Sequence, residues 1–464
     1  MARKRQKNAS DRGTLSDFSL KVYKGELVLL TGPSGCGKST VLRLINGLIP
    51  HFFPGKLTGE VLINGENISS KDLYETARIV GTVFQNPRSQ FYNVDTTGEL
   101  AFGCENQGLP AEEIYDRIDH TVARFQIEKL MDRSIFRLSG GEKQKIACAA
   151  IDAAETDIIL LDEPSANLDY NATIQLRELI RIWKENGKTI IAAEHRIAYL
   201  WDMIDRAVIM DNGQIVSEIR GDEKDSLKPE NLAKMGLRST KVESPAEVEL
   251  PVVLEGDKTF TIQDMYFSYN GSKTECVNID TLTLSEGKIT AITGANGIGK
   301  TTFLNCFCGL ERHCKGSLEF RGKLYTRKKR KTLCFMVMQD SGHQLFTESV
   351  MEEVIISFPK NTEQTELMAK EILERVDLSQ FADRHPMSLS GGQKQRLAIA
   401  CAIASGREIL LLDEPTSGLD YRHMMETAKL LRDLCDSGIT ILVVTHDSEL
   451  IHVCCDRKIV LSQL

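Results

Sequence analysis

Two glycine-rich loops have the residue types and spacing of phosphate-binding sites. Residues 32–40 read GPSGCGKST, and residues 294–302 read GANGIGKTT. Glycines let backbone N–H groups curl around phosphates, the lysine meets the β- and γ-phosphates, and the following hydroxyl coordinates Mg²⁺. We therefore predict two nucleotide sites, built by Gly32, Pro33, Ser34, Gly35, Cys36, Gly37, Lys38, Ser39 and Thr40 in the first loop and by Gly294, Ala295, Asn296, Gly297, Ile298, Gly299, Lys300, Thr301 and Thr302 in the second.

A pair of carboxylates closes an apolar run in each half of the sequence. Asp162 and Asp413 end the runs IILLD and ILLLD. An aspartate at the carboxyl end of a strand would face the Mg²⁺, usually through water. Glu163 and Glu414 come directly afterwards and can polarise the attacking water. Such pairs can also be plain helix caps, but their order after a phosphate loop favours catalysis.

Histidine and glutamine side chains complete each set. A lone histidine at a strand end is more often a satisfied core residue, but His195 and His446 lie at the same distance from their carboxylates, which favours γ-phosphate contact. Gln85 and Gln339, in TVFQNP and MVMQDS, follow short apolar runs, and in register they indicate sensors of γ-phosphate and Mg²⁺ that also touch a partner protein. The predicted catalytic residues are Glu163, Glu414, His195, His446, Gln85 and Gln339, and the predicted Mg²⁺ ligands are Ser39, Thr301, Gln85, Gln339, Asp162 and Asp413.

A second kind of anion site appears once in each half, in the segments LSGGE and LSGGQ. A serine and two glycines precede a basic and apolar helical stretch, so each segment forms a helix N-terminus ready for an anion. The phosphate loop already fills that role for its own nucleotide, so this second site makes sense only opposite the nucleotide of another domain. Its predicted residues are Ser139, Gly140, Gly141 and Glu142 in the first half and Ser390, Gly391, Gly392 and Gln393 in the second.

The spacing of these motifs describes the elements that must position them. Ser139, Asp162 and His195 each recur 251 residues later, which indicates one duplicated fold. Apolar runs such as KGELVLL and GKITAIT feed the glycine loops, and similar runs alternate with stretches of helical periodicity. This alternation predicts an α/β fold with a mainly parallel sheet covered by helices. The predicted domains are residues 1–221 and 258–464, joined by a charged linker at 222–257.

Bulk composition narrows the classes of function. A chain of 464 residues is too long for a single hydrophobic core, so more than one domain is expected. The net charge of −8 gives no positive field that would attract nucleic acid, so no nucleic-acid partner is expected. No uncharged apolar run could span a bilayer, and the basic start is followed by no apolar segment, so any membrane role is expected to be peripheral. The twelve cysteines form no CxxC pair, which favours reduced thiols in packed positions over a metal site.

On these motifs the chain resembles the ATP-binding-cassette superfamily over nearly its whole length. The resemblance implies two tandem P-loop NTPase domains, each with a mainly parallel sheet core, an antiparallel β subdomain and a helical signature subdomain. It also implies that the two halves pair within the molecule, with two ATP molecules and Mg²⁺ between them. Each half's phosphate loop would face the other half's signature segment, Tyr269 would stack on adenine, and Asp169 and Asp420 would couple the two sites.

A narrower resemblance is to the fused ATPase subunit of energy-coupling-factor importers. It is carried by NGLIPHFFPGKLTGEVLING, VFQNPRSQFYNVDTTGELAFGCEN, MQDSGHQLFTESVMEEV and AAEHR, with Gln90 and Gln344 a few residues after the sensor glutamines. This resemblance implies ATP-driven uptake of a vitamin or a metal ion at the cytoplasmic face of the cell membrane. The implied partners are a transmembrane coupling subunit and a substrate-binding membrane subunit.

The sequence leaves two other functions open. A tandem sugar-import ATPase usually carries a degraded catalytic site in one half, whereas both sets are complete here. A soluble tandem-cassette translation factor carries a long basic helical insert between its halves, whereas the linker here is short and of mixed charge.

The halves differ in several features. Tyr269 lies 25 residues before its phosphate loop, but the same count in the first half reaches Lys7, and no counterpart of the strand at 258–267 is found there. Either the chain is truncated, or the first site binds adenine weakly.

Glu142 replaces the signature glutamine of the second half, and Cys36 in the phosphate loop is expected to be a small spacer rather than a redox switch. The basic run at 327–331 is expected to be a solvated turn, with contact to lipid headgroups or a partner as the alternative.

Overall fold

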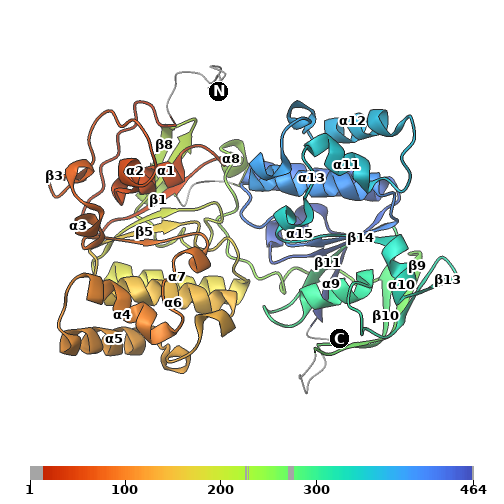
Figure 1. Ribbon diagram of the computed structural model, residues 1–464, viewed down its shortest axis with the longest axis horizontal. Helices are drawn as coiled ribbons and strands as arrows, with labels where there is room; N and C mark the ends of the chain where they lie inside the picture. Colours follow the sequence, from red (N-terminus) through yellow and green to blue (C-terminus); the bar gives the residue numbers. More distant parts are fainter. Residues whose placement is uncertain (1–13, 225–226, 228, 270–275, 462–464) are drawn as a thin grey trace, which may run out of the picture. The chain divides into compact units, whose positions relative to one another are not determined.

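The computed structural model describes residues 14–224, 227, 229–269 and 276–461, and the chain forms two compact units (Figure 1). The units comprise residues 1–242 and 243–464. The predicted linker is shared between them, since Leu237 is buried in the core of the first unit and Val248 in a core of the second. The bounds predicted for the domains and the linker remain a proposal.

The first unit is built on a six-stranded sheet of order β4-β5-β6-β1-β7-β8, in which only β8 pairs antiparallel to its neighbour. A separate hairpin joins β2 to β3. The strands are β1 (Leu27–Thr31), β2 (Leu62–Ile63), β3 (Glu66–Asn67), β4 (Val80–Val83), β5 (Ile158–Asp162), β6 (Thr189–Ala193), β7 (Arg206–Asp211) and β8 (Gln214–Arg220). The helices are α1 (Lys38–Ile45), α2 (Leu48–His51), α3 (Leu73–Ala77), α4 (Thr96–Asn106), α5 (Ala111–Phe125), α6 (Gly140–Ala153), α7 (Tyr170–Glu185) and α8 (Pro229–Lys234).

The second unit repeats this plan with a five-stranded parallel sheet of order β14-β15-β16-β11-β17. A four-stranded antiparallel sheet of order β10-β9-β12-β13 packs beside it (Figure 1). The strands are β9 (Thr259–Phe267), β10 (Val277–Ser285), β11 (Ile289–Thr293), β12 (Ser317–Phe320), β13 (Lys323–Thr326), β14 (Cys334–Val337), β15 (Ile409–Asp413), β16 (Thr440–Val444) and β17 (Arg457–Val460). The helices are α9 (Lys300–Cys308), α10 (Arg327–Leu333), α11 (Val350–Ser357), α12 (Thr365–Arg375), α13 (Gly391–Ala404), α14 (Tyr421–Asp436) and α15 (Ser448–Cys454).

Helices cover both faces of each parallel sheet, and this explains the continuous apolar runs of the strands. On β1, Leu27 and Leu29 pack into the cluster with α5, α6 and α7, whereas Val28 and Leu30 pack into the cluster with α1. All four side chains have no exposed surface, and burying each stabilises the fold by about 1.5–3 kcal/mol. The predicted α/β fold of tandem P-loop domains is confirmed.

Capping residues and apolar residues at helical spacing determine the helix that follows the strand-end carboxylates in each unit. The side chain of Asp169 accepts a hydrogen bond from the backbone N–H of Ala172 and so caps α7. Leu176, Leu179, Ile180 and Trp183 then recur at helical spacing and are buried. Asp420 caps α14 in the same way, so the two halves use one solution to place this helix after the catalytic strand.

The antiparallel part differs between the units. In the second unit, β9 pairs with β10 over its whole length. Among the described residues of the first unit, the segment equivalent to β10 lies at residues 15–23 and belongs to no strand. Leu15, Phe18, Leu20 and Val22 still pack against the core. In the described parts of both units, no helix combines the length and the apolar character needed to cross a membrane.

Candidate functional site

The first phosphate loop lies between β1 and α1 and wraps around the ammonium of Lys38. This ammonium donates to the carbonyl oxygens of Gly32, at 3.0 Å, and Pro33, at 3.2 Å, and it lies 3.3 Å from Nε2 of His195. The lysine is 5% exposed. The charge therefore lies at the centre of the loop, where the backbone N–H groups of the loop and the start of α1 can bind phosphate oxygens.

The second loop repeats this geometry between β11 and α9. The ammonium of Lys300 donates to the carbonyl oxygens of Gly294, at 2.9 Å, and Ala295, at 3.0 Å. It also lies 3.5 Å from Oδ1 of Asn296. The two loops thus offer equivalent positive centres for the phosphates of a nucleotide.

Glycine is required where each loop turns into its helix. Gly37 and Gly299 have φ angles of 107° and 104°, which side-chain-bearing residues rarely adopt. A Cβ on Gly37 would lie 2.7 Å from the side chain of Leu15, and a Cβ on Gly299 would lie 2.7 Å from the carbonyl oxygen of Cys276. The loops are therefore packed tightly from behind in both units.

A hydroxyl and a carboxylate meet beside each lysine. The Ser39 hydroxyl donates to Oδ1 of Asp162 at 2.8 Å, and the Thr301 hydroxyl donates to Oδ2 of Asp413 at 2.7 Å. Burial raises the pKa of both aspartates, and the hydroxyls partly offset this effect. A nearby divalent cation would favour their charged form.

This donor set fits Mg²⁺. Magnesium is usually held by one or two carboxylates together with phosphate oxygens and water, rather than by a cage of protein ligands. In the described part of the chain, no group of three or more His, Cys, Asp or Glu side chains forms such a cage. Gln85 and Gln339, also predicted as ligands, follow β4 and β14 and are solvent-exposed enough to turn toward an ion.

The glutamate of the first site lies between the predicted sensor Gln85 and the histidine His195. Oε2 of Glu163 accepts a hydrogen bond from the Gln85 amide at 2.8 Å, and Oε1 lies 3.3 Å from Nε2 of His195. The structure thus brings Gln85, Glu163, His195 and Lys38 together, as the sequence predicts.

The glutamate of the second site has a related environment. Oε1 of Glu414 lies 3.5 Å from Nε2 of His446, and the same ring nitrogen lies 3.0 Å from Oδ1 of Asn296. Glu163 and Glu414 have φ angles of 47° and 49°, and strained conformations of this kind cost on the order of 1–3 kcal/mol and concentrate at functional sites. The two halves therefore turn the backbone in the same way at this equivalent position.

Both signature segments begin a helix with the same reciprocal cap. The Glu142 side chain accepts from the backbone N–H of Ser139 at 2.7 Å, and the Gln393 side chain accepts from that of Ser390 at 2.9 Å. Each serine side chain in turn accepts from the backbone N–H three residues later. The exchange of glutamine for glutamate therefore keeps the cap and adds a negative charge at the start of α6. The predicted pairing of each signature with the other half's nucleotide remains a proposal.

The two halves differ in the residue at the position predicted to stack on adenine. Tyr269 is 48% exposed, and its hydroxyl lies 3.1 Å from that of Thr302 at the end of the second phosphate loop. Its ring is thus beside the loop, where a base could stack on it. Lys7, the position at the same count in the first half, lies outside the described residues.

Two further pairs of side chains hold the segments that follow the sensor glutamines. Oε1 of Gln90 accepts from the backbone N–H of Phe84 at 3.2 Å, and Gln344 does the same for Met338 at 2.9 Å. Glu99, which is 4% exposed, accepts from the backbone N–H groups of residues 92 and 93. Its counterpart Glu353 accepts from those of residues 346 and 347. Sequence reasoning did not predict that these two glutamates hold the backbone of the segments, although their repetition in both halves was a usable signal.

Two other sequence interpretations can be compared with the structure. Cys36 is buried and its pKa is raised by burial, so the thiol is not activated. The basic run at 327–331 forms most of α10 rather than a turn, and Arg330 within it is completely buried. That expectation of a solvated turn was wrong, because one face of α10 packs against the core beside α9.

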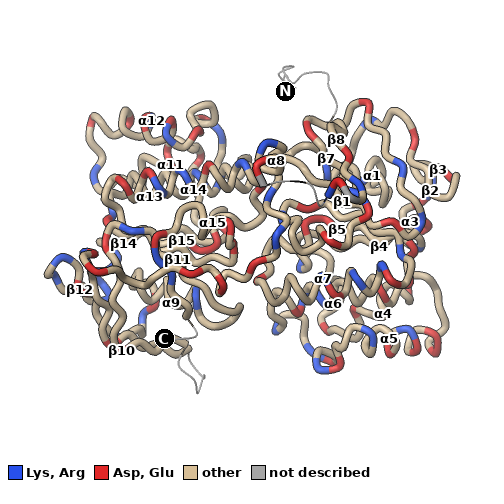
Figure 2. Tube along the Cα trace, turned by 180° about the vertical axis from the view of Figure 1, so that it is seen from behind, with Lys and Arg blue, Asp and Glu red and all other residues tan. Residues whose placement is uncertain are grey.

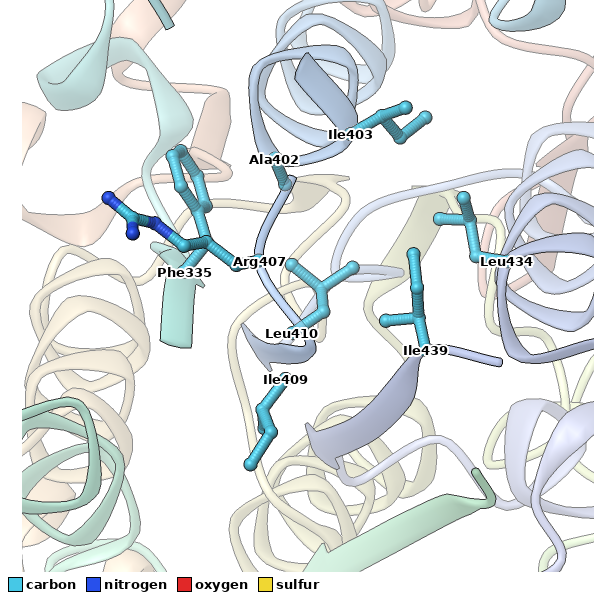
Figure 3. Close-up of a pocket in the computed structure, with 8 residues that line it drawn as sticks. All are labelled: Phe335, Ala402, Ile403, Arg407, Ile409, Leu410, Leu434 and Ile439. Carbon is cyan, nitrogen blue, oxygen red and sulfur yellow. The ribbon is translucent and has the colours of Figure 1, made fainter. Parts of the chain in front are cut away.

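A small apolar pocket in the second unit is distinct from both sites (Figure 3). It lies between α13, α14 and the sheet, where Ile403, Leu410, Leu434 and Ile439 line it. Its free volume of about 10 Å³ has room for roughly one water molecule. The pocket is therefore a packing defect and not a ligand site.

The family model described as "ABC transporter" matches residues 15–166 and 277–417. A protein of Treponema denticola named "Putative ABC transporter ATP-binding protein" is 45% identical over 460 residues, covering 98% of this chain and 93% of that protein. A Bacillus subtilis protein named "Putative HMP/thiamine import ATP-binding protein YkoD" is 31% identical over 479 residues, covering 97% of this chain and 87% of that protein.

Solved structures share the arrangement of elements. A chain from the structure described as ribosome-bound archaeal Pelota and ABCE1 superimposes with a TM-score of 0.66. The match covers 95% of this chain and 73% of that chain at 24% identity. At this identity the likeness concerns the fold alone.

Proposed function

Because this chain belongs to the ABC transporter family and is an ATPase, we propose that it powers a membrane importer whose membrane-spanning subunits are separate proteins. The importer is of the energy-coupling-factor type and takes up a vitamin or a metal ion. ATP and Mg²⁺ are bound at two sites, and the subunit acts at the cytoplasmic face of the cell membrane. The import function named for the Bacillus subtilis relative supports this direction of transport.

The observation that carries the proposal is the complete set of reacting groups in both units. In each unit a lysine ammonium is available for phosphate oxygens, and a hydroxyl and an aspartate lie together on the Mg²⁺ side. In each, a glutamate lies within 3.5 Å of a histidine ring nitrogen. The catalytic site is complete in both units. This favours an energy-coupling-factor importer over a tandem sugar-import ATPase, which usually has a degraded catalytic site in one half.

The side chains divide the work of hydrolysis. Bound Mg²⁺ would offset the charge of the phosphates. Lys38 and Lys300 orient the phosphates, while Glu163 and Glu414 orient the attacking water and accept its proton. His195 and His446 stand beside these glutamates, in contact with the phosphate loops through Lys38 and Asn296.

Exposed aromatic side chains support contact with membrane subunits. Tyr92 is 77% exposed, and its ring stacks on that of Phe102 at a centroid distance of 4.8 Å. Phe346 is 75% exposed at the equivalent place in the second unit. These residues follow the sensor glutamines, so an apolar helix of the transmembrane coupling subunit could dock there by its side chains. The substrate-binding membrane subunit would contact the coupling subunit.

The charge distribution argues against the translation-factor alternative. Basic and acidic residues are interspersed along most of the described chain in both units (Figure 2). The run of adjacent basic residues at 327–331 forms most of α10, and Arg330 within it is completely buried. A protein that binds ribosomal RNA would be expected to carry a basic patch. This distribution is consistent with no nucleic-acid partner.

Crosslinking in native membranes tests the importer role. Cysteines placed at Tyr92 and Phe346 are expected to capture the same integral membrane protein. Tyr115→Cys is the matched control, because Tyr115 is an aromatic on α5 with 66% exposure and lies outside both segments. Crosslinks from Tyr92 and Phe346 to ribosomal proteins alone would contradict the proposal.

A further inference from the structure

A buried carboxylate lies directly behind the first site. Glu194 follows the last residue of β6, precedes His195 and is only 2% exposed. Its Oε1 accepts hydrogen bonds from the backbone N–H of Ser165, at 3.1 Å, and from the hydroxyl of Tyr199, at 3.0 Å. Its Oε2 accepts from the backbone N–H of His195, at 2.9 Å, and from that of Arg196, at 3.3 Å.

These four hydrogen bonds join two segments that carry reacting groups. Ser165 comes two residues after Glu163, just past the end of β5, and His195 is the second residue after β6. One carboxylate therefore ties the backbone behind the water-orienting glutamate to the backbone of the histidine. The two side chains in front of it are 3.3 Å apart at Glu163 Oε1 and His195 Nε2.

The burial of Glu194 has a cost that its donors offset. Burial raises the pKa of Glu194, while the hydrogen bonds from Ser165 and Tyr199 act in the opposite direction. A buried carboxylate is retained only where donors satisfy its oxygens. Here both carboxylate oxygens accept hydrogen bonds. Three of the four donors are backbone N–H groups, so the carboxylate fixes the positions of two backbone segments.

The second unit joins the two equivalent segments with different residues. Thr445 occupies the position equivalent to Glu194, and the carboxylate is carried two residues later by Asp447. Oδ2 of Asp447 accepts from the hydroxyl of Thr416 at 2.7 Å, and its backbone N–H donates to the hydroxyl of Thr445 at 3.0 Å. Thr416 is the counterpart of Ser165, so the same two segments are joined.

We propose that Glu194 is a positioning residue of the first ATP site. Through the hydrogen bonds between its carboxylate and the backbone, Glu194 holds Glu163 and His195 in place to reach the γ-phosphate. The inference rests on the roles proposed above for Glu163 and His195. It assigns to the first unit a support that the second unit builds from Thr416, Thr445 and Asp447.

Turnover of the full chain with the second site inactivated tests this inference. In a Glu414→Gln background, Glu194→Gln replaces one acceptor oxygen by an NH₂ group that faces N–H donors. We expect kcat to fall about 10- to 100-fold, since small displacements of reacting groups have effects of this size, while KM for ATP stays within about threefold. The reciprocal variant, Asp447→Asn in a Glu163→Gln background, is expected to behave in the same way.

A transplanted support distinguishes positioning from general stability. The triple variant Ser165→Thr, Glu194→Thr, Arg196→Asp installs the residues of the second unit and is expected to recover at least a third of the kcat lost in Glu194→Gln. A Glu194→Gln variant with kcat within twofold of its parent would overturn the inference, and so would a folded triple variant that recovers nothing. If Glu194→Gln does not fold, the triple variant alone decides. The double variant Glu163→Gln, Glu414→Gln serves as the separate test of the underlying roles: if it keeps its activity, the assigned chemistry fails, and not only the support.

Discussion

The two units agree closely on the side of the γ-phosphate and differ on the side where adenine is expected. In both, a hydroxyl donates to the strand-end aspartate at 2.7–2.8 Å, and a glutamate with positive φ lies near a histidine. Behind the second phosphate loop, β10 pairs with β9, and Tyr269 follows β9. Behind the first loop, the described residues 15–23 pack without such a pair. We propose from this comparison that the two sites share their chemistry and differ in their affinity for ATP.

The largest expected effect concerns the chemistry that the units share. Changing Glu163 and Glu414 together to glutamine should lower ATP turnover by a factor of roughly 10²–10⁴, because general-base action is lost while the phosphate contacts remain. Steady-state phosphate release measures turnover, and filter binding of labelled ATP checks that binding persists. Wild-type turnover in the double variant would show that these glutamates do not orient the water.

The next effect concerns the side on which the units differ. Tyr269→Ala should weaken ATP binding at the Lys300 site by roughly 5- to 150-fold, since stacking of a base on an aromatic ring contributes about 1–3 kcal/mol. The measurement is nucleotide affinity in a Lys38→Ala background, which leaves the Lys300 site to report. Tyr269→Phe is the control and should bind normally, because it keeps the ring. Equal affinity in the alanine and phenylalanine variants would remove the basis of the asymmetry.

A smaller effect is expected from the signature segments. Glu142→Gln should change turnover by less than about threefold, since glutamine can accept from the Ser139 N–H as Gln393 does for Ser390 at 2.9 Å. Glu142→Ala removes half of the reciprocal cap and should cost about 1 kcal/mol of stability. Turnover and thermal melting of both variants, beside Gln393→Ala, separate the two effects. A tenfold loss in Glu142→Gln would mean that the charge itself is needed.

The smallest effect concerns stability at the outer strand of the sheet. Ser285 and Arg457 hold the pKa of Asp257 at about 2, below its usual value, so its charge stabilises the fold above pH ~4 and this contribution is lost as the pH falls toward 2. In the first unit, Arg206 occupies the equivalent position and pairs with Glu26 and Glu218 instead. Asp257→Asn should lower the melting temperature at pH 7 by roughly 2–4 °C and flatten its acid dependence.

The control for this experiment is an exposed ion pair. Glu366→Gln breaks a pair with Lys370 on the surface of α12 and should leave the melting temperature unchanged within error. Equal shifts in the two variants would mean that the pair of Asp257 with Arg457 adds nothing specific.

The fold and the reacting groups were predictable because their signals are short and repeated. Glycine loops, strand-end carboxylates and capped helices each depend on a few adjacent residues, and the repeat at 251 residues set their register. The structure places Lys38, Asp162, Glu163 and His195 together, as that register requires.

The supports of the site were not predictable in the same way. The carboxylate of Glu194 depends on donors from two separate segments, and a single glutamate before a histidine does not reveal them. The buried Arg330 within a basic run was missed because charge alone does not show which side of a short helix packs on the core. The packing of residues 15–23 without a paired strand likewise depends on tertiary contacts.

Equilibrium binding of Mg²⁺-ATP to the double variant Glu163→Gln, Glu414→Gln tests the central claim most directly. Isothermal titration calorimetry of the full chain should give two ATP molecules per chain, in two phases whose affinities differ by roughly 5- to 150-fold. Lys300→Ala in the same background should remove the tighter phase, and Lys38→Ala the weaker one. A single ATP per chain, or two sites of equal affinity, would contradict an ATPase with two complete sites that differ at adenine.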